Sequence, residues 1–131
     1  MDKIIYLPTF LTATIKDWKP LLKPDKYKII VLKNLKQLVD EDEITLYAYC
    51  IMHNHIHIVW QIKDDISISE VQKDFFESTA KKIKKDLEIH HPEVLKLFIS
   101  TQKDRGYHFW KRRQYNFNIT QLSMDKIIYL P

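Results

Sequence analysis

Two runs of β-forming residues, joined by a short polar step, restrict the fold of this chain more than any other feature. The runs are EITLYAYCIM at residues 43–52 and HIHIVWQI at residues 55–62, and both are rich in β-branched and aromatic side chains. Only His53 and Asn54 separate them. The pattern therefore predicts two strands joined by a tight turn.

The segments around this hairpin predict a further strand and two helices. Residues 8–16 are rich in Thr, Phe and Ile, which favours a strand that starts at or just after Pro8. From Asp25, a plausible N-cap, apolar residues recur at helical spacing. A second helical pattern starts at Ser67, which has capping-box spacing to Glu70.

The last third of the chain completes an alternating order of strands and helices. HHPEVLKLFIS, residues 90–100, predicts a linker with one helical turn, and HFWKRR and QYNFNI, residues 108–119, predict two short strands. Residues 120–130 suit a terminal helix. The order predicts an α+β sandwich of the ferredoxin-like or split βαβ kind, with one mainly antiparallel sheet covered by helices.

The length and composition indicate an ordinary globular protein. A chain of 131 residues is expected to form a single domain, residues 1–131. No apolar run reaches the roughly 18 residues of a membrane span, and the N-terminus lacks the basic region of a signal peptide, so we expect a cytoplasmic protein. The single cysteine, Cys50, lies in an apolar stretch and is expected to be a packed core thiol.

The octapeptide MDKIIYLP occurs twice, at residues 1–8 and 124–131. It is too short for a stacking structural repeat, whose periods are about 20 to 50 residues. A feature of cloning, a duplication and a record of truncation all remain open as explanations.

Alternate residues of a strand point to the same face, so His55 and His57 are expected to present two imidazoles side by side. Such a pair is half of a divalent metal site. The alternative is an ordinary pair of surface or hydrogen-bonded histidines. His53 could face the same metal or cap the turn. The other three histidines show no pattern and are expected in loops or at the surface: His90, His91 and His108.

The segment KDRGYHFWKRRQYNF, residues 103–117, interleaves cationic and aromatic residues. Cations that meet phosphates and rings that stack on bases are the two components of single-strand binding. A hairpin with an aromatic inner face and a solvated basic outer face is an equally good interpretation. The net charge of +4 permits polyanion binding without requiring it.

The motif LYAYCIMHNHIHIVW, residues 46–60, closely resembles the core of the single-tyrosine HUH transposases, especially the REP-associated tyrosine transposases. In that family a strand ends in Met-Pro-Asn-His-hydrophobic-His. Four other segments resemble the family in the same order, so the resemblance covers most of the chain. They are TFLTATIKDW, EVQKDFFESTAKKIKK, FWKRRQY and SMDKIIYL.

The resemblance implies a mechanism. His55 and His57 would hold Mg²⁺ or Mn²⁺ at the scissile phosphate of single-stranded DNA, and Tyr129, on a C-terminal helix, would attack it. The products are a 5′-phosphotyrosine and a free 3′-hydroxyl, and strand transfer is the reverse step. A free tyrosine has a pKa near 10, so reaching equal phenol and phenolate at neutral pH takes about 4 kcal/mol, which a nearby divalent cation can supply.

The resemblance also implies single-stranded or hairpin DNA as the partner. Lys111, Arg112 and Arg113 would then meet phosphates, and Tyr107 and Trp110 would offer stacking platforms. Relatives include both monomers and homodimers, and the sequence does not distinguish these states.

The sequence departs from the family at two places. His53 replaces the usual proline, and the polar metal ligand expected one helical turn after Tyr129 would fall past Pro131. A longer natural chain, His53 or a partner subunit could supply that ligand, or the protein could bind hairpin DNA without cleaving it. A third alternative is a histidine-triad nucleotide hydrolase, although Asn54 interrupts the apolar spacing of that motif.

Overall fold

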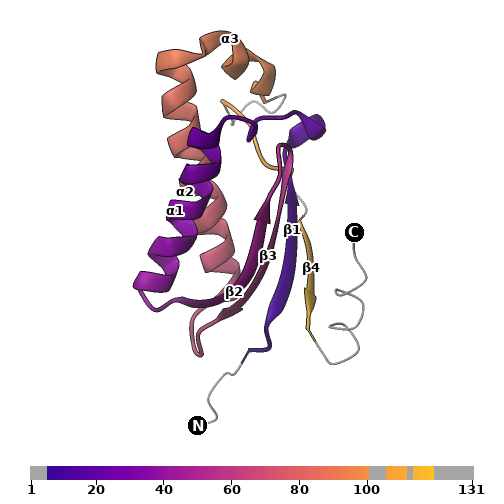
Figure 1. Ribbon diagram of the computed structural model, residues 1–131, viewed down its shortest axis with the longest axis vertical. Helices are drawn as coiled ribbons and strands as arrows, with labels where there is room; N and C mark the ends of the chain where they lie inside the picture. The colour runs from indigo at the N-terminus through magenta and orange to yellow at the C-terminus, as the bar shows by residue number, and fades with distance from the viewer. Residues whose placement is uncertain (1–5, 101–105, 112–113, 120–131) are drawn as a thin grey trace.

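Four antiparallel strands form one sheet in the order β2-β3-β1-β4 (Figure 1). The computed structural model describes residues 6–100, 106–111 and 114–119. Its elements are β1 (Thr9–Thr14), η1 (Lys16–Trp18), α1 (Asp25–Asp40), β2 (Ile44–Ile51), β3 (His55–Ile62), α2 (Ile68–His90), α3 (Pro92–Leu95), η2 (Lys96–Phe98) and β4 (Tyr115–Asn118).

The helices α1 and α2 lie side by side on one face of the sheet (Figure 1). The consecutive strands β2 and β3 form the predicted hairpin, and β1 lies between β3 and β4. This is the split βαβ arrangement, so the predicted α+β fold is confirmed. The helix predicted at residues 120–130 lies outside the described residues.

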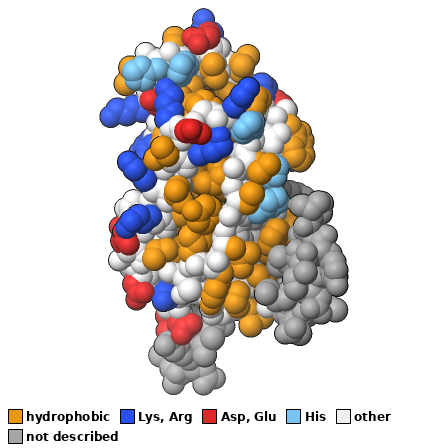
Figure 2. All heavy atoms as spheres, in the orientation of Figure 1, with side chains coloured by type: hydrophobic (Ala, Val, Ile, Leu, Met, Phe, Trp, Pro, Cys, Tyr) orange, Lys and Arg blue, Asp and Glu red, His pale blue; other side chains and the backbone are white. Residues whose placement is uncertain are grey.

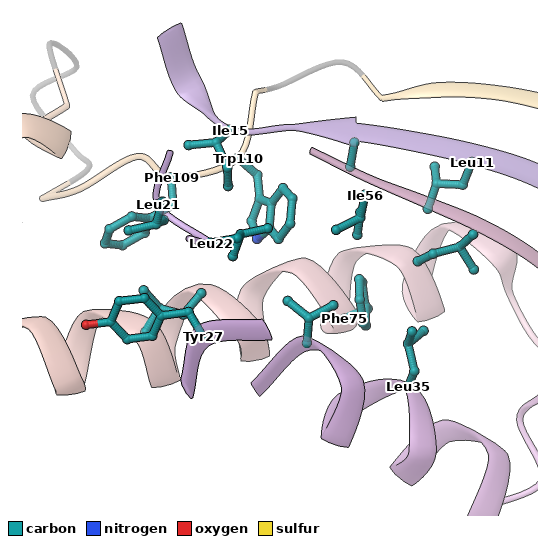
Figure 3. Close-up of a cluster of buried hydrophobic side chains, with 14 of the residues drawn as sticks. Leu11, Ile15, Leu21, Leu22, Tyr27, Leu35, Ile56, Phe75, Phe109 and Trp110 are labelled. Atoms are coloured by element: carbon teal, nitrogen blue, oxygen red, sulfur yellow. The ribbon is translucent and has the colours of Figure 1, made fainter. Parts of the chain in front are cut away.

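The core fills the space between the sheet and these two helices (Figure 3). Along β3, burial alternates strictly, and the residues that face the helices are at most 1% exposed: Ile56, Ile58, Trp60 and Ile62. Trp60 contacts Phe75 of α2 edge to face, with 5.8 Å between ring centroids. Burying each such side chain stabilises the fold by about 1.5–3 kcal/mol. The same alternation leaves His55 and His57 on the opposite face of the strand.

Of the predicted helix starts, the one at Ser67 is confirmed and the cap at Asp25 is not. The Ser67 hydroxyl accepts a hydrogen bond from the Glu70 amide at 3.3 Å, as the capping-box spacing predicts. The prediction that Asp25 caps α1 is wrong, because the capping residue is Pro24 and Asp25 is the first helical residue. In that position its carboxylate still opposes the positive end of the helix dipole.

A partly buried polar cluster of Lys26, Tyr27 and Asp86 joins the two helices. The Tyr27 hydroxyl donates to Oδ2 of Asp86 at 2.7 Å, and Nζ of Lys26 lies 2.7 Å from the same oxygen. Hydrogen bonds from Lys26 and then Tyr27 lower the pKa of Asp86. Burial, followed by the hydrogen bond to Asp86, raises the pKa of Tyr27. The cluster therefore fixes α1 against α2 with Asp86 ionised.

Two local predictions need correction. Cys50 is exposed rather than packed in the core, because it lies on the edge strand β2 opposite His57, on the face away from the helices. Of the two short strands predicted after residue 107, QYNFNI contains β4. In the described part of HFWKRR, Trp110 forms only an isolated bridge with Ile15, because its side chain enters the core.

None of the helices in the described ranges is long and apolar enough to cross a membrane.

Candidate metal and nucleic-acid site

The face of the sheet opposite α1 and α2 carries a mixed set of histidine, hydroxyl and aromatic side chains. Residues that are paired across antiparallel strands share a face, so the register defines this set. Eight residues of this set are here called the open face: Phe10, Thr12, Thr14, Cys50, His55, His57, Tyr115 and Phe117. Figure 2 shows histidine side chains at the surface beside a strip of hydrophobic side chains.

His55 and His57 lie next to each other on this face, as the alternation predicts. Their ring centroids are 4.9 Å apart, with 75° between the ring planes. Nδ1 of His55 lies 2.8 Å from Oδ1 of Asn54, and Nδ1 of His57 lies 2.9 Å from Oγ1 of Thr12. Both rings are therefore held through the same nitrogen, and both present Nε2 as the remaining ring atom that can bind a ligand.

The hydrogen bonds also select the tautomer that a metal site needs. The Asn54 carboxamide donates through Nδ2 to the carbonyl of Trp18 at 3.3 Å, which leaves Oδ1 as the acceptor for His55. Nδ1 of His55 must then carry the proton, and Nε2 keeps its lone pair. Such outer hydrogen bonds are the usual way in which proteins orient histidine ligands.

The electrostatic environment keeps His57 neutral. Burial of the ring, and secondly the neighbouring His55, lower the pKa of His57 below its ordinary value of 6.5. Because only the neutral imidazole binds a metal ion, the half-buried position prepares His57 for coordination at neutral pH.

The turn before β3 is attached to the segment after β1 by three hydrogen bonds. The amide of Ile15 donates to the carbonyl of Asn54 at 2.9 Å, and the amide of Leu22 donates to the carbonyl of His53 at 2.8 Å. The third is the bond from Asn54 to Trp18. The His53 side chain is exposed, and the described residues contain no group of three or more His, Cys, Asp or Glu that could hold a metal ion. The turn role of His53 is therefore the one that the structure supports.

Of the predicted phosphate-binding residues, Lys111 falls within the described ranges. Its side chain is exposed, and its amide donates to the carbonyl of Thr14 at 2.7 Å, which places it beside the end of β1. Arg112, Arg113 and the predicted nucleophile Tyr129 lie outside the described residues.

The two predicted stacking residues lie in the packing around α2. Trp110 is 6% exposed, and its indole nitrogen donates to Oγ1 of Thr79 at 3.0 Å, so its ring belongs to the core (Figure 3). This burial does not suit a stacking platform, and Trp110 leaves the set of DNA-binding candidates. Tyr107 is half-buried, lies near parallel to the Phe109 ring at 6.5 Å and has Nζ of Lys84 5.1 Å from its ring centroid.

Other aromatic rings occupy the open face, and the sequence interpretation missed them as a group. Phe10 stacks on Phe117 at 5.2 Å and lies 5.6 Å from His57, and Tyr115 contacts Phe117 at 5.4 Å. Tyr115 is 64% exposed. The alternation in QYNFNI indicates that Tyr115 and Phe117 share a face, but only the strand register shows that this is the histidine face.

A protein-family model matches most of the chain. Residues 11–129 match the family model described as "Transposase IS200 like". A search of curated proteins gives no significant match.

Two solved structures share the fold. One is the REP-associated tyrosine transposase bound to a REP hairpin, with 14% identity, a TM-score of 0.64 and coverage of 98% of this chain and 67% of that chain. The other, from Deinococcus radiodurans R1, is described as a candidate transposase, with 14% identity, a TM-score of 0.63 and coverage of 98% and 88%. At 14% identity, these two similarities show a shared fold and no more.

Proposed function

Because the chain belongs to the IS200-like transposase family, we propose that it cleaves and rejoins single-stranded DNA in transposition or hairpin processing, with Tyr129 as the nucleophile. His55 and His57 are the proposed metal ligands. The observation that carries the proposal is the adjacent pair of imidazoles, each held through Nδ1 on the open face.

The residues present fit Mg²⁺ or Mn²⁺ only in part, and the fit suggests how the site is completed. Two neutral imidazoles supply two nitrogen ligands, whereas these cations prefer oxygen for most of their coordination shell. Phosphate and water oxygens, together with a polar side chain outside the described residues, would supply the remainder. When bound, the ion stabilises negative charge on the scissile phosphate and favours the phenolate.

The chemistry assigned to the chain itself is one exchange of phosphoester bonds. The Tyr129 hydroxyl loses its proton to solvent, and its oxygen forms a bond to phosphorus as the bond to the 3′-oxygen breaks. The 3′-oxygen takes up a proton from solvent and leaves as a hydroxyl. The 5′-phosphotyrosine keeps the energy of the broken phosphodiester, so a second 3′-hydroxyl can reverse the step without ATP. Thr12 and Asn54 act as positioning residues because they orient the two imidazoles.

The proposed DNA partner is a hairpin with flanking single strands. The hairpin bound by the similar REP-associated transposase supports this choice. Lys111, with Arg112 and Arg113, would contact phosphates, and the exposed ring of Tyr115 would stack on a base. We place this activity in the cytoplasm, in a monomer or a homodimer.

A labelled hairpin oligonucleotide tests the proposal. Incubated with Mn²⁺, the protein should form an adduct that survives denaturation, and Tyr129→Phe or His57→Ala should abolish it. His90→Ala is the matched control, because His90 is exposed at the end of α2 and should not affect the adduct. An adduct that persists in Tyr129→Phe would disprove the assigned nucleophile.

Binding without cleavage is the second candidate function. The two imidazoles alone are a weak site for Mg²⁺ or Mn²⁺, and a protein that adds no further ligand would bind hairpin DNA without cleaving it. In that case the protein should bind the hairpin with unchanged affinity in His57→Ala and form no adduct at any Mn²⁺ concentration.

A further inference from the structure

Trp18 lies beside the turn that precedes the histidine pair, because its carbonyl accepts a hydrogen bond from Asn54. Its side chain is 59% exposed, whereas Trp60 and Trp110, the other two tryptophans of the chain, are 0% and 6% exposed. Within the described part of the chain, no aromatic ring or cation is paired with its indole. A large apolar ring is therefore presented to solvent.

The backbone that carries Trp18 is strained. Asp17 and Trp18 have φ values of 57° and 58°, the left-handed region that residues with a bulky side chain rarely adopt. The amide of Trp18 donates to the carbonyl of Ile15 at 3.0 Å, which closes the turn. Strained residues persist only where surrounding contacts impose them, and they are concentrated at functional sites.

A side-chain hydrogen bond to this strained segment connects it to the metal-site candidate. Asn54 donates through Nδ2 to the carbonyl of Trp18 and accepts through Oδ1 from Nδ1 of His55. One side chain thus connects the Trp18 backbone to the His55 imidazole. The backbone bonds from Ile15 to Asn54 and from Leu22 to His53 hold the flanks of the same segment. The Trp18 backbone is therefore held in place relative to His55.

Several other large hydrophobic side chains are exposed, and a single exposed apolar residue usually has no special meaning. Trp18 differs in three respects: its backbone is strained, its carbonyl is tied to the histidine turn, and its segment is cationic. Lys16, Lys19 and Lys23 lie within five residues of it in the sequence, and they outnumber the one acidic residue, Asp17, which pairs with Lys19 at 3.3 Å. An exposed ring on a held backbone, with cationic side chains nearby in the chain, is an arrangement suited to single-stranded nucleic acid.

We propose that Trp18 is a stacking platform for an unpaired base of the DNA strand that enters the site at His55 and His57. This inference rests on the proposed function, since it assumes a single-stranded DNA substrate. Stacking on an indole tolerates any base, so Trp18 would set the path of the strand rather than read its sequence. Trp18 is then a positioning residue for the phosphate to be cleaved.

Tryptophan fluorescence tests the proposal without any need for cleavage. The intact protein is titrated with a hairpin that carries a single-stranded extension, in EDTA, so that binding alone is measured. Because Trp60 and Trp110 are buried, DNA contact should quench mainly the Trp18 emission. Trp18→Phe should lose this quenching while keeping most of the affinity, because a phenyl ring can still stack.

Trp18→Ala should weaken binding by about 5- to 150-fold. The matched control is Ile89→Ala, which removes a 65% exposed apolar side chain from α2 and should leave affinity unchanged. Melting temperatures of all three variants should equal that of the wild type, which shows that they fold.

Two results would overturn the stacking role: unquenched emission at saturating DNA, or equal affinities for Trp18→Ala and the wild type. Failure of the proposed function gives a different result, which is DNA binding with Trp18 quenching but no covalent adduct in Mn²⁺. A protein that binds no DNA at all contradicts both.

Discussion

The hydroxyl of Thr12 lies 2.9 Å from Nδ1 of His57, and the two residues are direct partners across β1 and β3. A strand that is distant in sequence thus holds one of the two proposed metal ligands in place. His55 is held differently, by the adjacent Asn54 of the turn. The candidate site therefore depends on both the sheet register and the local turn.

Replacing Thr12 with valine should weaken metal binding. Valine keeps the β-branched shape but cannot hydrogen bond to Nδ1, so the His57 ring loses its fixed orientation. Loss of such an outer contact typically lowers metal affinity about 10- to 100-fold. Isothermal titration with Mn²⁺ measures the change, and Thr14→Val, on the same face of β1, should have little effect. Equal affinities for Thr12→Val and the wild type would show that this hydroxyl does not orient the ligand.

His57 should stay neutral, and so able to bind a metal ion, below the ordinary pKa of histidine. Burial, and secondly His55, lower the pKa of His57, so the neutral ligand form survives at pH values below 6.5. The stabilisation linked to neutral His57 is present above pH 6.5 and is lost as the pH falls through the lower folded-state pKa. Imidazole NMR titration in the absence of metal measures this directly. If the midpoint of the His57 titration lies above pH 6.5, the inference that its surroundings lower its pKa is wrong.

The hydrogen bond between Trp110 and Thr79 should contribute to stability rather than to DNA binding. Thr79→Val leaves the buried indole N–H without its acceptor and should lower the free energy of unfolding by about 1–3 kcal/mol. Trp110→Ala also opens a cavity and should cost about 3–5 kcal/mol. Denaturant unfolding measures both changes. If Thr79→Val instead reduced hairpin affinity at unchanged stability, the core position of Trp110 would be in doubt.

Asp86 should make the fold sensitive to acid. Hydrogen bonds from Lys26 and Tyr27 lower its pKa, so its contribution is present above the unfolded-state pKa near 3.8 and is lost as the pH falls below that value. Asp86→Asn should therefore lower the melting temperature at neutral pH. As the pH is lowered, the melting temperature of this variant should fall less than that of the wild type. Asp42→Asn is the control, because Asp42 pairs with Lys63 at an exposed position. Parallel melting curves for Asp86→Asn and the wild type across the acid range would refute this role.

The sequence predicted the sheet, the two long helices and the shared face of His55 and His57, because these depend on periodicity and short-range spacing. Thr12 could not be found this way, since it meets His57 only through the pairing of β1 with β3. Trp110 was misassigned because a ring in a basic segment suits both a core and a stacking role, and only packing against Thr79 and Phe76 decides between them.

Cys50 shows the same limit at an edge strand. Its apolar neighbours suggest burial, but β2 has a partner on one side only and the Cys50 side chain lies on the open face. The exposure of Cys50 depends on whether helices cover its face of the sheet, and α1 and α2 cover the other face.

The most direct test of the central claim is to find which DNA end remains attached to the protein. Two copies of one hairpin substrate, labelled at the 5′ end or at the 3′ end, are incubated with the protein in Mn²⁺ and separated under denaturing conditions. A 5′-phosphotyrosine at Tyr129 requires that the 3′ label migrates with the protein while the 5′-labelled fragment is released with a free 3′-hydroxyl. Transfer of the 5′ label, or cleavage with neither label attached, would contradict the account.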